Sequence, residues 1–151
     1  MQLRVIAVGR RMPSWVAEGW REYARRMPSH LPLELVEVEA DRAAGDARAA
    51  EGAALAARCL RPGVVVALDG SGSAWTTQRL AGRLEDWQMN GDPVQFLVGG
   101  ADGHAPELLE TADLRWSLGP LTLPHMLVRV ILAEQLYRAT SILSGHPYHR
   151  D

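Results

Sequence analysis

The side chains best suited to chemistry stand together in the last six residues, "HPYHRD" (146–151). Terminal residues are usually frayed and expendable, whereas this tail carries two of the five histidines together with a tyrosine and an arginine. His146 and His149 lie three residues apart and could chelate a metal, but no third ligand has a suitable spacing, so we expect no metal site. The tail is therefore either an accident of composition or a segment that is held in place and used.

Three glycine-rich segments each follow an apolar run of strand character: "LDGSG" (68–72), "VGGADG" (98–103) and "LGPLTLPH" (118–125). In parallel sheets, ligands bind outside the carboxyl ends of the strands, where glycine allows close approach to the backbone. A single glycine after a strand would indicate only the end of that strand. Three such ends favour a small-molecule pocket.

The sequence lacks the fingerprints of phosphate-binding loops. The first apolar run leads into "VGRRMPSW" (8–15), and "GSGSAW" (70–75) holds only the first two glycines of G-x-G-x-x-G. This absence disfavours a nicotinamide-dependent oxidoreductase. The strand ends are instead apolar and rich in backbone groups, which suits the flat adenine of a nucleoside better than a pyrophosphate.

The composition is that of one soluble domain, which we place at residues 1–151. The chain is 47% hydrophobic and 23% charged, and apolar runs such as "VVVAL" (64–68) are far too short to span a membrane. A single cysteine, Cys59, excludes an intrachain disulfide, and the N-terminus lacks the pattern of a secretory signal. We therefore expect a cytoplasmic protein.

The charge distribution indicates only weakly whether the protein binds nucleic acid. The formal net charge of −2 argues against a uniformly basic nucleic-acid-binding protein. All 16 basic residues are arginine, however, and residues 1–30 hold six of them against two glutamates. Such a basic edge is compatible with RNA, although a solvated surface would have the same composition.

Apolar runs and helical patterns alternate along the chain, which is typical of an α/β fold with a mainly parallel sheet and helices on both faces. The expected strands are 3–9, 33–38 (an edge strand), 64–69, 94–100 and 114–119. The expected helices are 14–27, 46–60, 76–90, a short one begun near Pro106, and 124–143. Ser14, Asp46 and Thr122 are the expected N-caps, and Gly145 is the expected stop of the last helix.

The segment that contains the last predicted helix, "LTLPHMLVRVILAEQLYRA" (121–139), is apolar on more than one side. Such a helix is either fully buried or packs on a partner subunit, and we favour a homodimer. His125 and Arg129 lie four residues apart, as do Glu134 and Arg138, so each pair shares a helix face.

The chain resembles the bacterial ribosomal RNA large subunit methyltransferase H family in five segments: "MQLRVIAVGR", "LDGSG", "FLVGGADG", "LTLPHMLVRVILAEQLYRA" and "HPYHR". Members of this family are small SPOUT-class enzymes that methylate N3 of a pseudouridine in 23S rRNA. The resemblance implies an α/β fold with a C-terminal trefoil knot, a homodimer, and S-adenosylmethionine as the methyl donor. It also implies that the substrate is 23S rRNA within the assembled 70S ribosome.

The resemblance assigns residues to the cofactor site and places the tail beside it, with RNA contacts from both subunits. The implied cofactor-binding residues are those of the strand ends described above: Leu68, Gly99, Leu118, Gly119, Pro120, Leu121, Thr122 and Leu123. We predict that Arg10, Arg11 and Arg129 contact RNA. Arg10 and Arg11 follow a strand end and are best placed to meet a phosphate.

Methyl transfer to uracil N3 gives the tail a chemical purpose. The enzyme must position donor and acceptor and exclude water, and N3 is a poor nucleophile until its proton is lost. A base, or a cation that stabilises the developing anion, is therefore needed. His149 and Arg150 would supply these two functions, and Tyr148 could stack or donate a hydrogen bond. The proton acceptor is either His149 or a bound water.

A non-catalytic α/β module that binds nucleotides or RNA is the rival interpretation. It would have the same glycine-ended strands, but nothing in it would require His149 and Arg150. Histidines 30, 104 and 125 have ordinary structural explanations, His125 at the start of the last helix. The five tryptophans fit a core better than base-stacking platforms, with Trp75 as the candidate exception.

Overall fold

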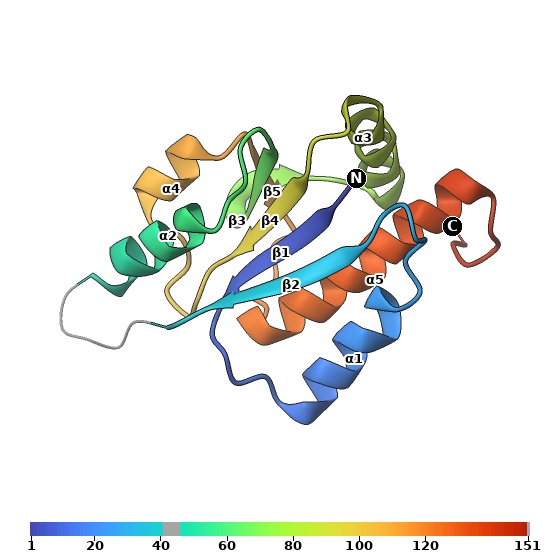
Figure 1. Ribbon diagram of the computed structural model, residues 1–151. Helices are drawn as coiled ribbons and strands as arrows, with labels where there is room; N and C mark the ends of the chain where they lie inside the picture. The colour runs from blue at the N-terminus through green and yellow to red at the C-terminus, as the bar shows by residue number, and fades with distance from the viewer. Residues whose placement is uncertain (41–45, 151) are drawn as a thin grey trace.

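The computed structural model describes residues 1–40 and 46–150. Five parallel strands form one sheet in the order β2-β1-β4-β3-β5 (Figure 1). The strands are β1 (Leu3–Val8), β2 (Leu33–Val38), β3 (Val64–Ala74), β4 (Val94–Val98) and β5 (Leu114–Ser117). The helices are α1 (Ser14–Ala24), α2 (Ala47–Ala57), α3 (Thr77–Asn90), α4 (Pro106–Thr111) and α5 (His125–Ser144). The predicted α/β class and parallel sheet are confirmed.

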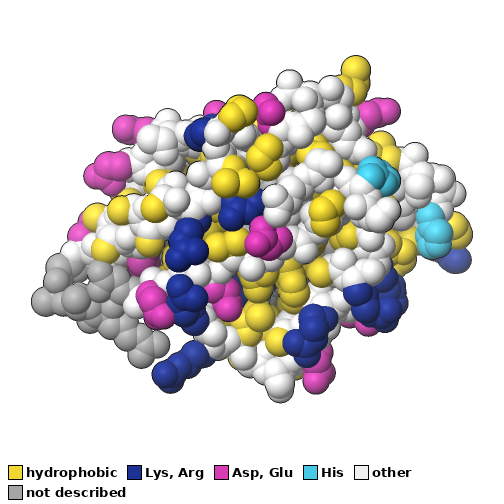
Figure 2. Space-filling view, in the orientation of Figure 1, with side chains coloured by type: hydrophobic (Ala, Val, Ile, Leu, Met, Phe, Trp, Pro, Cys, Tyr) yellow, Lys and Arg dark blue, Asp and Glu magenta, His cyan; other side chains and the backbone are white. Residues whose placement is uncertain are grey.

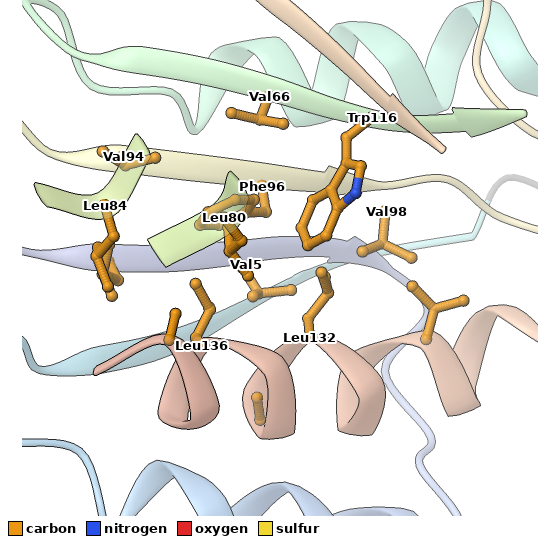
Figure 3. Close-up of a cluster of buried hydrophobic side chains, with 14 of the residues drawn as sticks. Val5, Val66, Leu80, Leu84, Val94, Phe96, Val98, Trp116, Leu132 and Leu136 are labelled. Carbon is orange, nitrogen blue, oxygen red and sulfur yellow. The ribbon is translucent and has the colours of Figure 1, made fainter. Parts of the chain in front are cut away.

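Helices cover both faces of this sheet. On one face α1, α3 and α5 pack over a cluster of strand and helix residues that includes Phe96, Trp116 and Leu132 (Figure 3). On the other face α2 and α4 contribute Leu55 and Leu108 to a smaller cluster with Ile6 and Leu97. Every residue of β1 and β4 is buried, because both strands lie inside the sheet with a helical layer on each side. The edge position predicted for 33–38 is confirmed by β2.

The observed helix ends match some of the predicted caps but not others. Asp46 caps α2 by accepting from the backbone N–H of Arg48, and Gly145 ends α5 at a φ of 73°. The caps expected from Ser14 and Thr122 were wrong, since Pro13 and Pro124 occupy the N-cap positions of α1 and α5. A proline brings an extended backbone to the helix start but has no side-chain oxygen with which to cap it.

One strand is longer than expected. β3 runs to Ala74 instead of ending at residue 69, with a shift of its register against β5 between Leu68 and Ser73. In the described part of the chain, no helix combines the length and apolarity needed to cross a bilayer.

Candidate functional site

A cavity of about 400 Å³ opens at the carboxyl ends of β4 and β5 and beside residues 68–70 of β3, where the register of β3 against β5 begins to shift. The strand order places β4, β3 and β5 side by side. Segments 68–70, 98–103 and 116–123 therefore converge at the cavity. Val128, one turn into α5, contributes to the same wall as His125. The predicted convergence of three glycine-bearing segments is thus confirmed, although residues 68–70 lie inside β3 rather than after its end.

All eight residues assigned to the cofactor site line this cavity: Leu68, Gly99, Leu118, Gly119, Pro120, Leu121, Thr122 and Leu123. The structure adds neighbours that were not assigned, namely Asp69, Gly70, Val98, Gly100, Ala101, Gly103, Trp116, Ser117, His125 and Val128. Most of these lie inside the motifs "LDGSG" and "VGGADG", so a whole-motif assignment would have included them. His125 was expected only to orient the helix start, whereas the residue also lines the cavity.

Gly99 is held against the backbone on the far side of its own loop. A Cβ atom at this position would lie 2.9 Å from the carbonyl carbon of Gly103, closer than real Cβ contacts allow. Gly100 and Gly103 pair in an isolated bridge that closes this loop. Only glycine therefore fits here without a shift of the backbone that walls the cavity.

The ionisable side chains of the lining are Asp69 and His125. Burial acts to raise the pKa of Asp69, but hydrogen bonds from the side chain and backbone of Ser71 outweigh it, and the pKa lies below its usual value. Burial, assisted by the charge of Arg129, lowers the pKa of His125. At neutral pH the cavity therefore has one carboxylate at its rim and a neutral imidazole in its wall.

A second hollow, of about 290 Å³, shares Trp116, Leu118 and Leu123 with the first and extends to Gln135 on α5. Trp75 borders it, stacked on Trp116 with a ring-centre distance of 4.8 Å and an interplanar angle of 11°. The guanidinium carbon of Arg83 lies 4.5 Å from the Trp75 ring. Trp75 is thus engaged by a stacked tryptophan and by a guanidinium, as expected of a packed side chain.

The C-terminal tail is held in place rather than frayed. The Tyr148 hydroxyl donates to Glu134 Oε1 at 3.0 Å, and the Tyr148 ring meets that of Tyr137 edge to face at 4.7 Å. Arg138 lies over the Tyr148 ring at 4.7 Å, and one of its nitrogens is 3.3 Å from Nδ1 of His149. Figure 1 shows the chain turning back after the end of α5. Arg150 is exposed, and Asp151 lies outside the described residues.

Within one chain, the tail and the cavity are separate. Tyr148, His149 and Arg150 do not line the cavity. His125 lies at the cavity, and the anchors Glu134 and Arg138 follow it along α5. At about 1.5 Å of rise per residue, these anchors stand roughly 14 and 20 Å further along the helix. The expectation that the tail lies beside the pocket is therefore not met by a single subunit.

The three arginines predicted to contact RNA have different surroundings. Arg10 and Arg11 are exposed, and Arg10 Nε forms an ion pair with Glu39 at 2.7 Å. Arg129 is wholly buried, so its assignment as an RNA contact was wrong. Figure 2 shows arginines interspersed with acidic side chains on the face in view, rather than a single basic patch.

Comparison with known proteins identifies the class. The family described as "Predicted SPOUT methyltransferase" matches residues 1–149. The fold is similar to that of a methylase family protein from Haemophilus influenzae, with a TM-score of 0.62 and 10% identity over 99% of this chain and 70% of that one. A methyltransferase from Legionella pneumophila, solved with bound SAM, has a TM-score of 0.53 and 9% identity over 93% of this chain and 66% of that one. The chain therefore belongs to the SPOUT methyltransferase family.

Its sequence relatives narrow this class. The chain is 51% identical over 155 residues to the ribosomal RNA large subunit methyltransferase H of Pseudomonas fluorescens, covering 99% of this chain and 100% of the relative. The enzyme of the same name from Azotobacter vinelandii is 49% identical over 156 residues, with the same coverage. The chain is thus a member of the ribosomal RNA large subunit methyltransferase H family.

Proposed function

We propose that this protein uses S-adenosylmethionine to methylate N3 of a pseudouridine in 23S rRNA of the assembled ribosome, in the cytoplasm. The observation that carries the proposal is the convergence of all eight assigned residues on one cavity. Family membership at about half identity over the full chain supports the same reaction. We also propose that the chain forms the C-terminal trefoil knot that the family resemblance implies.

The lining of the cavity fits a nucleoside. Leu68, Leu118 and Leu123 supply apolar surface, while the glycines of 99–103 expose main-chain groups that can meet the edge of an adenine. Neither a glycine-rich phosphate loop nor a lysine is present in the sequence, as expected for a ligand without phosphate. The Asp69 carboxylate, whose pKa is lowered, can balance the positive charge that the cofactor carries.

Held by Leu68, Gly99 and the residues 118–123, S-adenosylmethionine would supply an electrophilic methyl group on a sulfonium. The protein's own task is to hold the base in line, exclude water and stabilise the uracil as N3 loses its proton. Arg150 brings a positive charge, Tyr148 keeps its proton because burial and its hydrogen bonds raise its pKa, and His149 brings an imidazole.

A homodimer would bring the tail of one subunit to the cavity of the other. The separation of the two parts along α5 supports this arrangement, because one subunit does not join them. Apolar side chains near the cavity and on α1 also remain exposed: Leu121 to 78% and Trp15 to 59%. Burial of such surface is the usual driving force of subunit association.

The test of the function is transfer of labelled methyl from S-adenosylmethionine to ribosomes from a strain that lacks the modification, with free rRNA in parallel. We expect label on a pseudouridine of the large subunit, from ribosomes and not from free rRNA. A folded protein that labels neither substrate and binds no S-adenosylmethionine would overturn the proposal and leave a non-catalytic binding module.

Deletion of residues 146–151 separates an enzyme from a binding module. We expect the truncated chain to keep its fold and its affinity for S-adenosylmethionine but to lose turnover, since the tail does not line the cavity. Unchanged turnover would contradict a catalytic tail.

A further inference from the structure

A further hollow, which we call the tail-side pocket, lies at the opposite end of α5 from the cavity. Its volume is about 610 Å³, within the range of about 300–1,000 Å³ that small-molecule sites have. Its walls come from residues 26–31, the last two turns of α3, the last two turns of α5, and His146 of the tail. Among the described residues, this pocket and the cavity have no lining residue in common. The tail-side pocket is therefore a separate site, next to the tail that we propose to act on the target base.

The floor of the tail-side pocket is closely packed, whereas its rim is open. Leu31 is buried in the floor, and the hydroxyls of Thr140 and Ser141 donate at 2.7 Å to carbonyl oxygens three residues earlier in α5. At the rim, the Met89 side chain is 83% exposed. A flexible thioether in such a position can close over a flat ligand.

Arg26 and Tyr137 give the pocket a surface suited to a flat ring. The guanidinium carbon of Arg26 lies 5.8 Å from the centre of the Tyr137 ring, and an ion pair with Glu22 holds the guanidinium in place. Aromatic rings and arginine planes are the groups on which proteins stack the unpaired bases of RNA. Arg26 belongs to the arginine-rich segment 1–30, whose composition alone is equally compatible with RNA and with a solvated surface.

The hydrogen-bonding groups of the pocket suit the edge of a base better than a phosphate. Gln88 has an amide that can both donate and accept. Nδ1 of His146 accepts from the backbone N–H of Tyr148 at 3.2 Å, so the neutral ring carries its proton on Nε2 and can donate there. Arg26 and Glu85 are the lining residues, among those described, that are charged at neutral pH, and their charges are opposite. Such a lining has no excess of positive charge with which to attract a phosphate.

We propose that the tail-side pocket binds one unpaired base of the rRNA that neighbours the target pseudouridine. The proposal rests on the proposed function. The target base itself must reach the methyl donor in the cavity, and the two sites share no described lining residue, so this pocket receives a different nucleotide. His146 connects the pocket to the tail, because it lines the pocket and accepts from the backbone of Tyr148. A base seated in the pocket thereby helps to keep the tail docked.

Steady-state kinetics on ribosomes test the pocket with a matched pair of arginines. Arg25 and Arg26 are both exposed and both pair with Glu22, but only Arg26 lines the pocket. We expect Arg26→Gln to raise the KM for ribosomes about tenfold, the scale of one lost stacking contact, with a smaller change in kcat. Arg25→Gln should stay within about twofold of the wild type. Equal effects of the two substitutions would overturn the proposal.

Methyl NMR examines the pocket without turnover. Protein labelled with ¹³C at the methionine methyl groups would be titrated with millimolar uridine and adenosine 5′-monophosphates, with Met89→Leu used to assign the Met89 signal. We expect the Met89 signal to shift in the wild type and to shift much less in Arg26→Gln. The signal of Met126, which follows the cavity residue His125, reports any nucleotide that binds at the cavity instead. A Met89 signal that does not move with either nucleotide overturns the proposal.

Cosedimentation with ribosomes separates an incorrect pocket from an incorrect function. A wild-type protein that binds ribosomes but does not methylate them would count against the proposed function alone. Arg26→Gln that binds ribosomes as tightly as the wild type would count against the pocket alone, and a wild type that neither binds nor methylates would overturn both. Calorimetric binding of S-adenosylmethionine should be unchanged in Arg26→Gln, since Arg26 does not line the cavity.

Analytical ultracentrifugation distinguishes RNA from a second copy of the chain as the occupant. Arg26→Gln and Met89→Ala should associate as strongly as Arg25→Gln, because the pocket is proposed to face RNA. Weaker self-association of the two pocket variants would show that this face is an interface between subunits and would overturn the proposal.

Discussion

Arg129 and Glu37 form a partly buried ion pair that joins α5 to the edge strand β2. Nη1 of Arg129 lies 2.6 Å from Glu37 Oε2, and the arginine side chain is 0% exposed. Its Nη2 also donates to the carbonyl oxygens of Val8 at 3.0 Å and Gly9 at 2.7 Å, at the carboxyl end of β1. One side chain thus connects two strands to the first turns of the helix whose start lines the cavity.

Removal of this arginine should cost much of the protein's stability. Arg129→Met removes one donor each from the Glu37 carboxylate and two backbone carbonyls, and loss of one partner of a fully buried pair costs about 3–5 kcal/mol, which is the upper limit expected here. Arg10→Met removes the exposed pair with Glu39 and should cost less than about 1 kcal/mol. Urea unfolding of the two variants checks the difference. Equal losses would contradict the structural role of Arg129.

Two glycines of the cavity should respond differently to the same substitution. Gly99→Ala places a Cβ 2.9 Å from the carbonyl carbon of Gly103, whereas a Cβ at Gly70 would meet nothing within 4 Å. We expect Gly99→Ala to weaken S-adenosylmethionine binding about tenfold or more, which corresponds to about 1.4 kcal/mol. Gly70→Ala should stay within about twofold of the wild type. Isothermal titration calorimetry measures both, and a weaker effect at Gly99 than at Gly70 would argue against the proposed site.

Mixed dimers test whether the tail acts on the partner's cavity. One chain would lack residues 146–151 and the other would carry Gly99→Val, and each alone should be inactive. Random pairing of equal amounts makes about half of the dimers mixed, each with one complete site, so about a quarter of the wild-type activity should return. If each tail served its own chain, no activity would return on mixing. Co-expression with two affinity tags gives the mixed species.

Stability should fall as the pH drops below neutrality. His104 is buried, its Nε2–H donates to the Leu97 carbonyl oxygen at 3.0 Å, and burial lowers its pKa from the ordinary value of 6.5. The unfolded chain therefore binds a proton that the folded chain excludes, and the free energy of unfolding falls between the unfolded pKa and the lowered folded pKa. His125 contributes with the same sign.

The variant that checks this dependence is His104→Gln, which keeps a donor for Leu97 but has no titrating group. Its free energy of unfolding should change less than that of the wild type between pH 7.5 and pH 5.5, measured by urea titration at each pH. An identical slope in the two proteins would exclude His104 as a cause.

Much of the fold could be predicted from local patterns. The buried run at 64–68, the alternating run at 33–38 and the helix stop at Gly145 each reflect the surroundings of a few neighbouring residues. The caps at Ser14 and Thr122 failed for an equally local reason, because the neighbouring prolines set the helix starts.

The cavity was also accessible to sequence reasoning. Parallel strands bring their carboxyl ends to one edge of the sheet, so the glycines that follow β4 and β5 and those in the second half of β3 lie near one another because these strands are neighbours. The family resemblance then selected the residues from Leu68 to Leu123 that the structure gathers there. The resemblance assigned too few residues within each motif, since Gly100 and Gly103 also line the cavity but were not assigned.

The sequence by itself thus determined the order of strands and helices, the parallel sheet and the position of the cavity, because these follow from periodicity and from rules of strand connection. Only the tertiary structure decided the role of Arg129, whose partner Glu37 is 92 residues away, and the docking of the tail on Glu134 and Arg138. The sequence alone does not distinguish an arginine that contacts RNA at the surface from one that forms an ion pair inside the fold. The difference between them is the set of groups that folding brings within hydrogen-bonding distance, and no local pattern records that set.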